Sequence, residues 1–465
     1  MQNIPLEESI EKTIPIILVE TELFEDWFKK QTDHLKKWLS SNNFNAISGD
    51  FCLVPHSNGS LEKVIVGFCK NDFWIAGRLS KSLPLASYHI GELYGHISKV
   101  DSKEIKSNFV ASWCLGAYTF KRYKSKSSIQ VSKLVCPKET DLKYVKGLIH
   151  STYITRDLIN TPCEDLSPLD LANFSKSIAD KHGADFKLVS GDDLISKNFP
   201  AIHAVGRASV NDPQLIEICK GDKTFPKLTL VGKGVCFDSG GLDLKPSSGM
   251  RLMKKDMGGA ANVLGLANWI LSVELPLQIR IIIPAVENLV SSNSFKPGDV
   301  IRTRKGTSVE IGNTDAEGRL ILADALTYAC EDSPDLLIDC ATLTGSARSA
   351  LGSDIPALFS NSDNLANELM DYGVKRFDPV WRLPLWKNYM RLIDSKIADI
   401  NNAGESNFAG SITAALFLES FIKKEIPWIH LDMYCWNLES LPGRPAGGEA
   451  QSQRALFDLI VNRLC

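Results

Sequence analysis

The sequence predicts an α/β protein with two domains: a small N-terminal α/β module and a larger C-terminal domain with a mixed central sheet flanked by helices. The chain has 465 residues, which is too long for one ordinary hydrophobic core. Its second half alternates short apolar runs with segments of helical periodicity. A cluster of turn-forming residues separates that half from the first.

The N-terminal module is indicated by short β-rich runs that alternate with polar stretches between residues 51 and 123. We expect strands at 63–68 and 109–113. The basic stretch at 121–126 is short and isolated, so we expect a solvated hairpin or loop there.

A connecting helix is predicted over 141–159, where apolar residues recur on one helical face. Residues 160–168 follow as a chain break, in which Ser167 suits an N-cap and Pro168 suits the first helical position. The expected organisation is a domain at 1–140, the connecting helix and linker at 141–166, and a second domain at 167–465.

The C-terminal domain is predicted to hold a mixed or largely parallel sheet covered by helices. Strands are expected at 228–232, 279–283 and 336–338, and helices at 258–271 and 318–330. Ligands of such sheets bind beyond the strand ends, and several charged residues of this chain lie just past one.

The composition is that of a soluble globular protein, with 44% apolar and 23% charged residues. A net charge of −3 gives no electrostatic reason to expect nucleic acid or an anionic membrane as the main partner. The 11 cysteines are odd in number and form no Cys-x-x-Cys pair, which favours reduced thiols in the cytoplasm. The N-terminus lacks signal-peptide features, and no apolar run approaches the ~18–20 residues of a membrane span.

Three segments place charged residues beside buried elements. Residues 231–241 carry a strand into a glycine-rich turn, residues 256–261 begin a helix of small residues, and residues 313–320 lead into an apolar helix. Their charged residues, with one lysine that follows the first segment, are Lys233, Asp238, Lys245, Asp256, Asp315, Glu317 and Arg319.

Four carboxylates in one partly dry site would repel one another unless cations neutralised them. Divalent ions supply that charge, and carboxylate-rich sites suit the harder ones. Two ions roughly 3.5–4 Å apart could clamp the attacking and leaving groups and activate a water. Helix caps and solvated loops are the alternative that spacing alone leaves open. The sequence contains no His-Glu-x-x-His, so that single-zinc site is excluded.

Read together and in this order, the three segments resemble the leucyl (cytosol) aminopeptidase family. Residues 313–320 match that family's signature residue for residue, and 231–241 and 253–261 match as well. Looser likeness covers most of the chain and includes Trp113, 116–118, 156–162, 342–345 and 430–432. The resemblance implies a two-metal exopeptidase that removes single residues, with a leucine-like preference, from the free N-terminus of peptides.

The family also implies a set of ligands for two Mn²⁺ or Zn²⁺ ions: Lys233, Asp238, Asp256, Asp315 and Glu317. Asp238 and Glu317 would bridge both ions, and Lys233 would ligate as the neutral amine. Lys245 would polarise the scissile carbonyl, and Arg319 would hold a bicarbonate that shuttles the proton from the activated water. The free α-amine of the substrate would bind one metal, which restricts cleavage to N-termini.

Thr342, Leu343 and Gly345 would line the site and help to seat the bicarbonate, and Met253 would border the pocket for the N-terminal side chain. By the same resemblance, the N-terminal domain would be macro-like and without catalytic groups. The assembly would be a homohexamer whose sites face an interior cavity.

The departures from the family pattern are modest. Cys236 stands where threonine is common, and we expect a packed side chain rather than a ligand. The tail at 442–451 differs from the ending of the best-known members, which leaves side-chain preference and subunit contacts open. His430 is expected to be a strand-core histidine, because the ligand set is complete without it.

Two further classes of function are alternatives. Another two-metal hydrolase, such as a phosphoesterase, would commonly use histidines, and none of the eight lies in the three segments. A binding role, for ADP-ribose in the N-terminal domain or for nucleic acid, is not favoured by the charge balance. An inactive homologue is not favoured either, because no expected ligand is missing.

Overall fold

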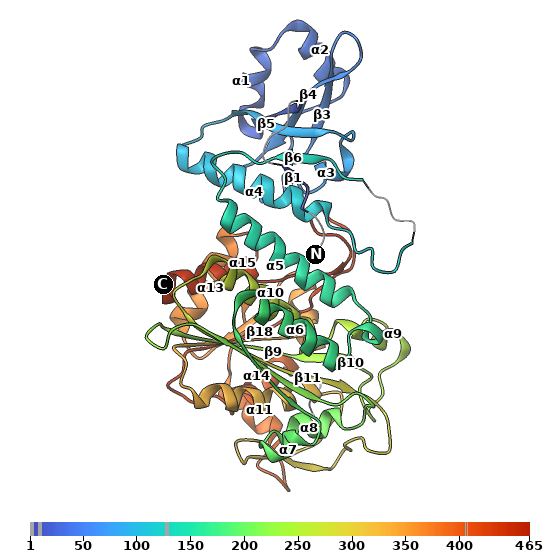
Figure 1. The fold of residues 1–465 in the computed structure, drawn as a ribbon, viewed down its shortest axis with the longest axis vertical. Coiled ribbons are helices and arrows are strands. Elements are labelled where there is room, and N and C mark those ends of the chain that lie inside the picture. Colours follow the sequence, from blue (N-terminus) through green and yellow to red (C-terminus); the bar gives the residue numbers. More distant parts are fainter. Residues whose placement is uncertain (1–3, 8–11, 126–129, 405, 407) are drawn as a thin grey trace. The chain divides into compact units, whose positions relative to one another are not determined.

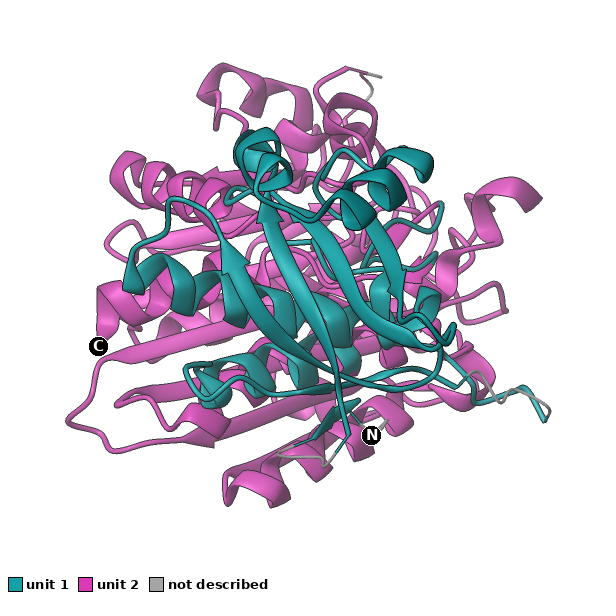
Figure 2. Cartoon of the chain, turned by 90° about the horizontal axis from the view of Figure 1, so that it is seen from above, with its two compact units in different colours: residues 1–153, 439–446 teal, residues 154–438, 447–465 magenta. Residues whose placement is uncertain are grey.

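The computed structural model describes residues 4–7, 12–125, 130–404, 406 and 408–465. By its contacts the chain divides into two compact units, residues 1–153 with 439–446 and residues 154–438 with 447–465 (Figure 2). The first division falls inside α5 (Leu142–Asn160), the helix expected at 141–159. The domain limits expected from the sequence, 1–140 and 167–465, stay a prediction.

The first unit is built on a six-stranded mixed sheet of order β1-β6-β5-β2-β4-β3 (Figure 1). Its strands are parallel except for β3, which runs antiparallel to β4 at the edge. The strands are β1 (Leu6–Glu7), β2 (Ile14–Glu20), β3 (Phe51–Pro55), β4 (Leu61–Phe68), β5 (Ser87–Tyr94) and β6 (Lys133–Val135). The helices are α1 (Phe24–Lys29), α2 (Asp33–Ser41), α3 (Leu79–Ser82) and α4 (Lys99–Ala117).

The strand expected at 63–68 is confirmed as part of β4, but the one expected at 109–113 is wrong, because these residues lie inside α4. The helix begins with a capping box between Ser98 and Asp101. Its second half is buried on every side, so the apolar run shows no helical periodicity and cannot be told from a buried strand. Residues 121–125 form an exposed turn, and residue 126 lies outside the described residues.

The second unit holds a nine-stranded mixed sheet of order β16-β15-β18-β14-β9-β11-β8-β7, with β10 paired to β11. The central strands β18, β14, β9, β11 and β10 run parallel, so their carboxyl ends meet at one edge. Those strands are β9 (Lys227–Gly232), β10 (Gly234–Asp238), β11 (Gln278–Asn288), β14 (Leu336–Ala341) and β18 (Trp428–Asp432). The flanking strands are β7 (Asp185–Ser190), β8 (Gln214–Lys220), β15 (Ala357–Ser360) and β16 (Trp381–Arg382). The three strands expected from the sequence in this domain are confirmed.

Helices cover both faces of this sheet (Figure 1). On one face α10 packs against α6 and α15, and on the other α11 packs against α8 and α14. These helices are α6 (Pro168–His182), α8 (Pro200–Gly206), α10 (Gly258–Val273), α11 (Glu317–Glu331), α14 (Gly410–Glu419) and α15 (Gln453–Leu464). The helices expected at 258–271 and 318–330 are therefore confirmed, as are the N-cap Ser167 and the leading Pro168 of α6.

The remaining elements of the second unit are short, apart from α13. They include two small sheets, β12 (Val300–Arg302), β13 (Ser308–Glu310) and β17 (Ile400–Asn401), and β19 (Trp436–Asn437) with β20 (Gly447–Gly448). The other helices are α7 (Asp193–Ser196), α9 (Ser247–Met250), α12 (Gly345–Leu351) and α13 (Asp363–Lys375). Among the described residues of both units, the 3-10 helices are η1 (Thr21–Leu23), η2 (Cys163–Asp165), η3 (Met253–Lys255) and η4 (Lys387–Ile393). Across the described residues, no helix is long and apolar enough to cross a membrane.

Candidate metal centre

The carboxyl edge of the central parallel strands gathers the charged residues of the three segments. Lys233 follows β9, Asp238 ends β10, and Asp432 ends β18. This is the edge at which ligands bind in open α/β sheets. A cavity of about 440 Å³ opens there, and it is lined by Lys233, Asp238, Lys245, Asp256, Asp315, Arg319, Thr342, Leu343, Gly345 and Met253 among others. Glu317, the remaining expected site residue, is buried beside these groups.

Three carboxylates converge in this centre. Asp238, Asp315 and Glu317 each present an oxygen that lies within 4.8 Å of the other two. Burial, together with the neighbouring Asp238, raises the pKa of Glu317 to about 8 and that of Asp315 to about 6. Both pKa values are raised for the same reason: folding brings negatively charged carboxylates close together where they are partly shielded from water.

Lys233 neutralises part of that charge from the buried side. Its ammonium lies 2.7 Å from Asp256 Oδ2 and 2.8 Å from Glu317 Oε1, and it donates to the Thr342 carbonyl at 3.0 Å. Burial lowers the pKa of Lys233, but the surrounding carboxylates outweigh it and raise this pKa above its usual value. Likewise, burial raises the pKa of Asp256, but Lys233 brings it below its usual value.

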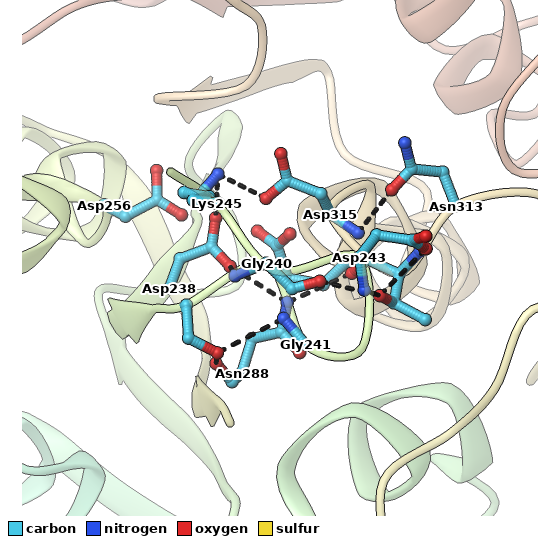
Figure 3. A network of polar contacts seen from close by, with 12 residues as sticks. Asp238, Gly240, Gly241, Asp243, Lys245, Asp256, Asn288, Asn313 and Asp315 are labelled. Atoms are coloured by element: carbon cyan, nitrogen blue, oxygen red, sulfur yellow. Dashed lines mark hydrogen bonds and ion pairs between the residues drawn. The ribbon is translucent and has the colours of Figure 1, made fainter. Parts of the chain in front are cut away.

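Lys245 lies at the more open side of the cluster, between Asp238 and Asp315 (Figure 3). Its Nζ is 2.8 Å from Asp238 Oδ2 and also contacts Asp315 Oδ1. Burial lowers the pKa of Lys245, but the adjacent carboxylates raise it overall. Lys245 therefore stays an ammonium that faces the cavity.

A second set of polar residues, which the sequence did not single out, holds the carboxylates in place. Asn288, at the end of β11, donates to Asp238 Oδ1 at 2.9 Å and to the Thr314 carbonyl at 3.0 Å. The backbone N–H of Gly240 donates to the same Asp238 oxygen (Figure 3). Asn288 is far from both partners in the sequence, so only the pairing of β10 with β11 brings it to the site.

Asp432 and Asn402 hold residues that line the cavity. Asp432 accepts hydrogen bonds from the backbone N–H groups of Leu343 and Thr344 and from the Thr344 hydroxyl. The Asn402 carbonyl accepts from Arg319 Nη1 at 2.6 Å. Of these two residues, only Asp432 lies in a stretch of looser family likeness. Both are identified by their hydrogen bonds to cavity residues that are distant in the sequence.

Arg319 keeps an unused donor inside the protein. The residue is 8% exposed, and its Nε has no hydrogen-bond partner in the part of the chain that the structure describes. Burial lowers the pKa of Arg319 to about 10. Leu343, Thr342 and Gly345 line the same cavity, although the Leu343 N–H already donates to Asp432.

A glycine in the third segment is required by close packing. A Cβ added at Gly318 would lie 2.5 Å from Lys233 Cε and 2.7 Å from Lys233 Nζ. Gly259 is similarly constrained, because a Cβ there would lie 2.0 Å from the Cys340 carbonyl oxygen. The small residues at the starts of α10 and α11 therefore let both helices approach the ends of the parallel strands.

Two residues with metal-binding side chains are placed outside this centre. Cys236 is buried within β10 and its thiol donates to the Gly234 carbonyl. His430 is fully buried in β18, where Nδ1 lies 2.6 Å from Asp339 Oδ1. Both side chains pack inside the sheet layer, as expected from the sequence.

The centre suits divalent cations on its own evidence. Glu317 Oε2 is buried in the carboxylate cluster and has no hydrogen-bond partner among the described residues. Such an atom, in a cluster where the pKa values of Glu317 and Asp315 are raised, is suited to compensation by a cation. A mixed α/β sheet that carries this acidic centre and two lysines at its carboxyl edge fits the class of metal-dependent hydrolases.

Comparison with known proteins resolves the class further. The catalytic-domain model of the cytosol aminopeptidase family matches residues 153–457, and the model of the M17 aminopeptidase N-terminal domain matches residues 14–137. A probable cytosol aminopeptidase of Chlamydia caviae is 42% identical over 420 residues, which cover 85% of this chain and 84% of that protein.

Solved structures agree with this result. The cytosol aminopeptidase of Coxiella burnetii shares 45% identity over 99% of both chains with a TM-score of 0.93. The bottromycin maturation enzyme BotP in complex with Mn shares 29% identity, covers 97% of this chain and 99% of its own, and has a TM-score of 0.86. The chain belongs to the cytosol aminopeptidase family, and it is a metallo-exopeptidase of the leucyl aminopeptidase type.

Proposed function

We propose that this enzyme releases N-terminal residues, with a leucine-like preference, by means of two divalent cations. The proposed ligands are Lys233, Asp238, Asp256, Asp315 and Glu317. The observation that carries the proposal is the convergence of oxygens of Asp238, Asp315 and Glu317 within 4.8 Å of one another. It is supported by Glu317 Oε2, which is buried and has no hydrogen-bond partner among the described residues. Mn²⁺ and Zn²⁺ are the candidate ions, and the Mn complex of the similar BotP supports the first.

When bound, the cations supply Lewis acidity that lowers the pKa of water and polarises a carbonyl. Lys233 must then give up a proton, since only a neutral amine can ligate. In the metal-free chain, its ammonium neutralises the negative charge of Asp256 and Glu317. Bound cations would neutralise that charge instead, and their own positive charge would lower the pKa of Lys233 and so favour the neutral amine.

The remaining side chains act without ligating. Lys245, held between Asp238 and Asp315, can donate a hydrogen bond to the scissile carbonyl oxygen as negative charge develops there. Arg319 can hold a bicarbonate through its unpartnered Nε, and that anion would carry a proton between water and the leaving amine. Asn402 fixes the guanidinium by accepting from Nη1.

Location and assembly belong to the same proposal. Relatives named cytosol aminopeptidase, and the absence of disulfides among the described cysteines, support a cytoplasmic location. Self-association as a homohexamer rests on family membership alone. Peptides with a free N-terminus are the proposed substrates.

Metal removal tests the proposal directly. Exhaustive chelation should abolish hydrolysis of leucine-p-nitroanilide, and Mn²⁺ or Zn²⁺ should restore it. Acetylation of a peptide's N-terminus should block cleavage, because it removes the lone pair that the α-amine offers to a cation. Activity that survives chelation, or undiminished cleavage of the acetylated peptide, would contradict the proposed mechanism.

A further inference from the structure

Two cationic side chains on one wall of the catalytic cavity have no ion-pair partner among the described residues. Lys255 and Arg348 both line the cavity, together with Tyr434 and Met253. Lys255 comes from η3, directly before Asp256, and Arg348 comes from α12. The remaining basic residues of the cavity, Lys233, Lys245 and Arg319, have the carboxylate or carbonyl partners described above.

Both cations contact the same aromatic ring. The Lys255 ammonium lies 4.6 Å from the centre of the Tyr434 ring, and the Arg348 guanidinium carbon lies 5.0 Å from it. Over the described part of the chain, neither side chain makes a hydrogen bond or an ion pair, and both make cation–π contacts with the ring. Asp256 also acts electrostatically on the Lys255 ammonium, but the two do not form an ion pair. Lys255 is 5% exposed, so water gives its charge little compensation.

Among the described residues, the acidic neighbour of Lys255 in the sequence, Asp256, is already committed to other partners. Asp256 Oδ2 pairs with Lys233 at 2.7 Å, and Oδ1 accepts from the Thr342 hydroxyl at 2.8 Å. Cation–π contacts stabilise a charge only weakly and do not replace an anion for a buried ammonium. The buried Lys255 ammonium is therefore short of one negative group among the described residues, and the exposed Arg348 adds a second positive charge at the same ring.

We propose that Lys255 and Arg348 form a subsite, ordered by the Tyr434 ring, for a carboxylate of the peptide substrate close to the cleaved bond. This inference rests on the proposed aminopeptidase function and names a substrate class for it. A peptide offers such a group in two ways, as the side chain of an N-terminal Glu or Asp or as the free C-terminus of a dipeptide.

Two matched pairs of substrates distinguish these sources. Glu-Ala-amide and Gln-Ala-amide differ only in the side-chain carboxylate, and Leu-Ala and Leu-Ala-amide differ only in the terminal carboxylate. For the metal-loaded enzyme we expect one carboxylate peptide to exceed its neutral partner in kcat/KM by about 10- to 100-fold, mainly through KM. The pair that shows this preference identifies the source.

The variants Lys255→Met and Arg348→Gln should each reduce that preference, and the neutral peptides should change by less than about threefold. Lys254→Met is the matched control, because this neighbouring lysine donates to the Asn160 carbonyl and is not among the described residues that line the cavity. Metal content and Tm are measured for every variant. Should Lys255→Met lose metal or fail to fold, the exposed Arg348→Gln decides.

Equal kcat/KM within both pairs, or a preference that survives both substitutions, would overturn the subsite while leaving the aminopeptidase function intact. Failure of the metal-loaded enzyme to hydrolyse any of the four peptides would overturn the proposed function, and the subsite with it.

Discussion

Replacing Gly318 by alanine should separate the chemistry of the metal centre from the stability of the fold. The added Cβ would lie 2.5 Å from Lys233 Cε and 2.7 Å from Nζ, whereas carbon atoms pack at about 3.5–4.0 Å. The end of the Lys233 side chain must therefore move by roughly 1 Å. It has no room to do so freely, because it is 3% exposed and held by Asp256, Glu317 and the Thr342 carbonyl.

The expected result is a folded protein with a damaged centre. Alanine is favoured over glycine in a helix by roughly 0.5–1 kcal/mol, which offsets part of the cost of the displaced lysine. A displacement of this size at a reacting centre costs about 100-fold in rate. We therefore expect kcat/KM for leucine-p-nitroanilide to fall by about that factor, with reduced Mn²⁺ content after dialysis and a Tm within a few degrees of the wild type.

Gly249→Ala is the control for metal content and stability, since a Cβ at this helical glycine meets nothing closer than 3.6 Å; it is not used for kcat/KM, because Gly249 lines the cavity. Metal content by plasma mass spectrometry and Tm by calorimetry are compared for the wild type and both variants, and kcat/KM for the wild type and Gly318→Ala. Full metal content and full activity in Gly318→Ala would refute the reasoning, because Lys233 would then tolerate displacement or lie outside the ligand set. Unfolding of Gly318→Ala would refute the claim that the clash is local.

Three further outcomes are expected. Asp256→Ala should lose bound metal and activity while the fold is kept, and unchanged metal content would remove Asp256 from the ligands. Asn288→Ala should weaken Mn²⁺ affinity about 10- to 100-fold, because Asp238 loses the donor that orients it, and a titration that matches the wild type would contradict this role. Burial raises the pKa of Asp324 to about 7, against the backbone N–H donors that lower it, so folded Asp324 keeps a proton that the unfolded chain loses near pH 4. Its contribution to stability is therefore complete below about pH 4 and declines as the pH rises to about 7. The difference in unfolding free energy between the wild type and Asp324→Asn, measured in urea, should shrink between pH 5 and 7.5, and a constant difference would show that Asp324 is ionised throughout.

The sequence by itself determined the residues that carry charge into the site. Each of the segments 231–241, 256–261 and 313–320 contains charged residues together with the strand end or helix start that positions them. These residues are close together in the sequence, so a local pattern is enough to find them. Their order along the chain also identified the family, which the comparisons confirm. The main strands and helices of the larger domain could also be predicted, because hydrophobic periodicity is a local property of the sequence.

Only the tertiary structure decided which other groups surround the charged residues of these three segments. Asn288, Asn402 and Asp432 reach the centre because the strand order is not the sequence order, and no local pattern records which strands become neighbours. The error at 109–113 has a related cause, since a helix buried on every side loses the periodicity that distinguishes it from a strand. The position of Lys255 and Arg348 around Tyr434 likewise depends on three separate elements meeting at one wall. Residue type and spacing define the chemistry that is available, whereas burial and long-range pairing decide which charges are left without a partner.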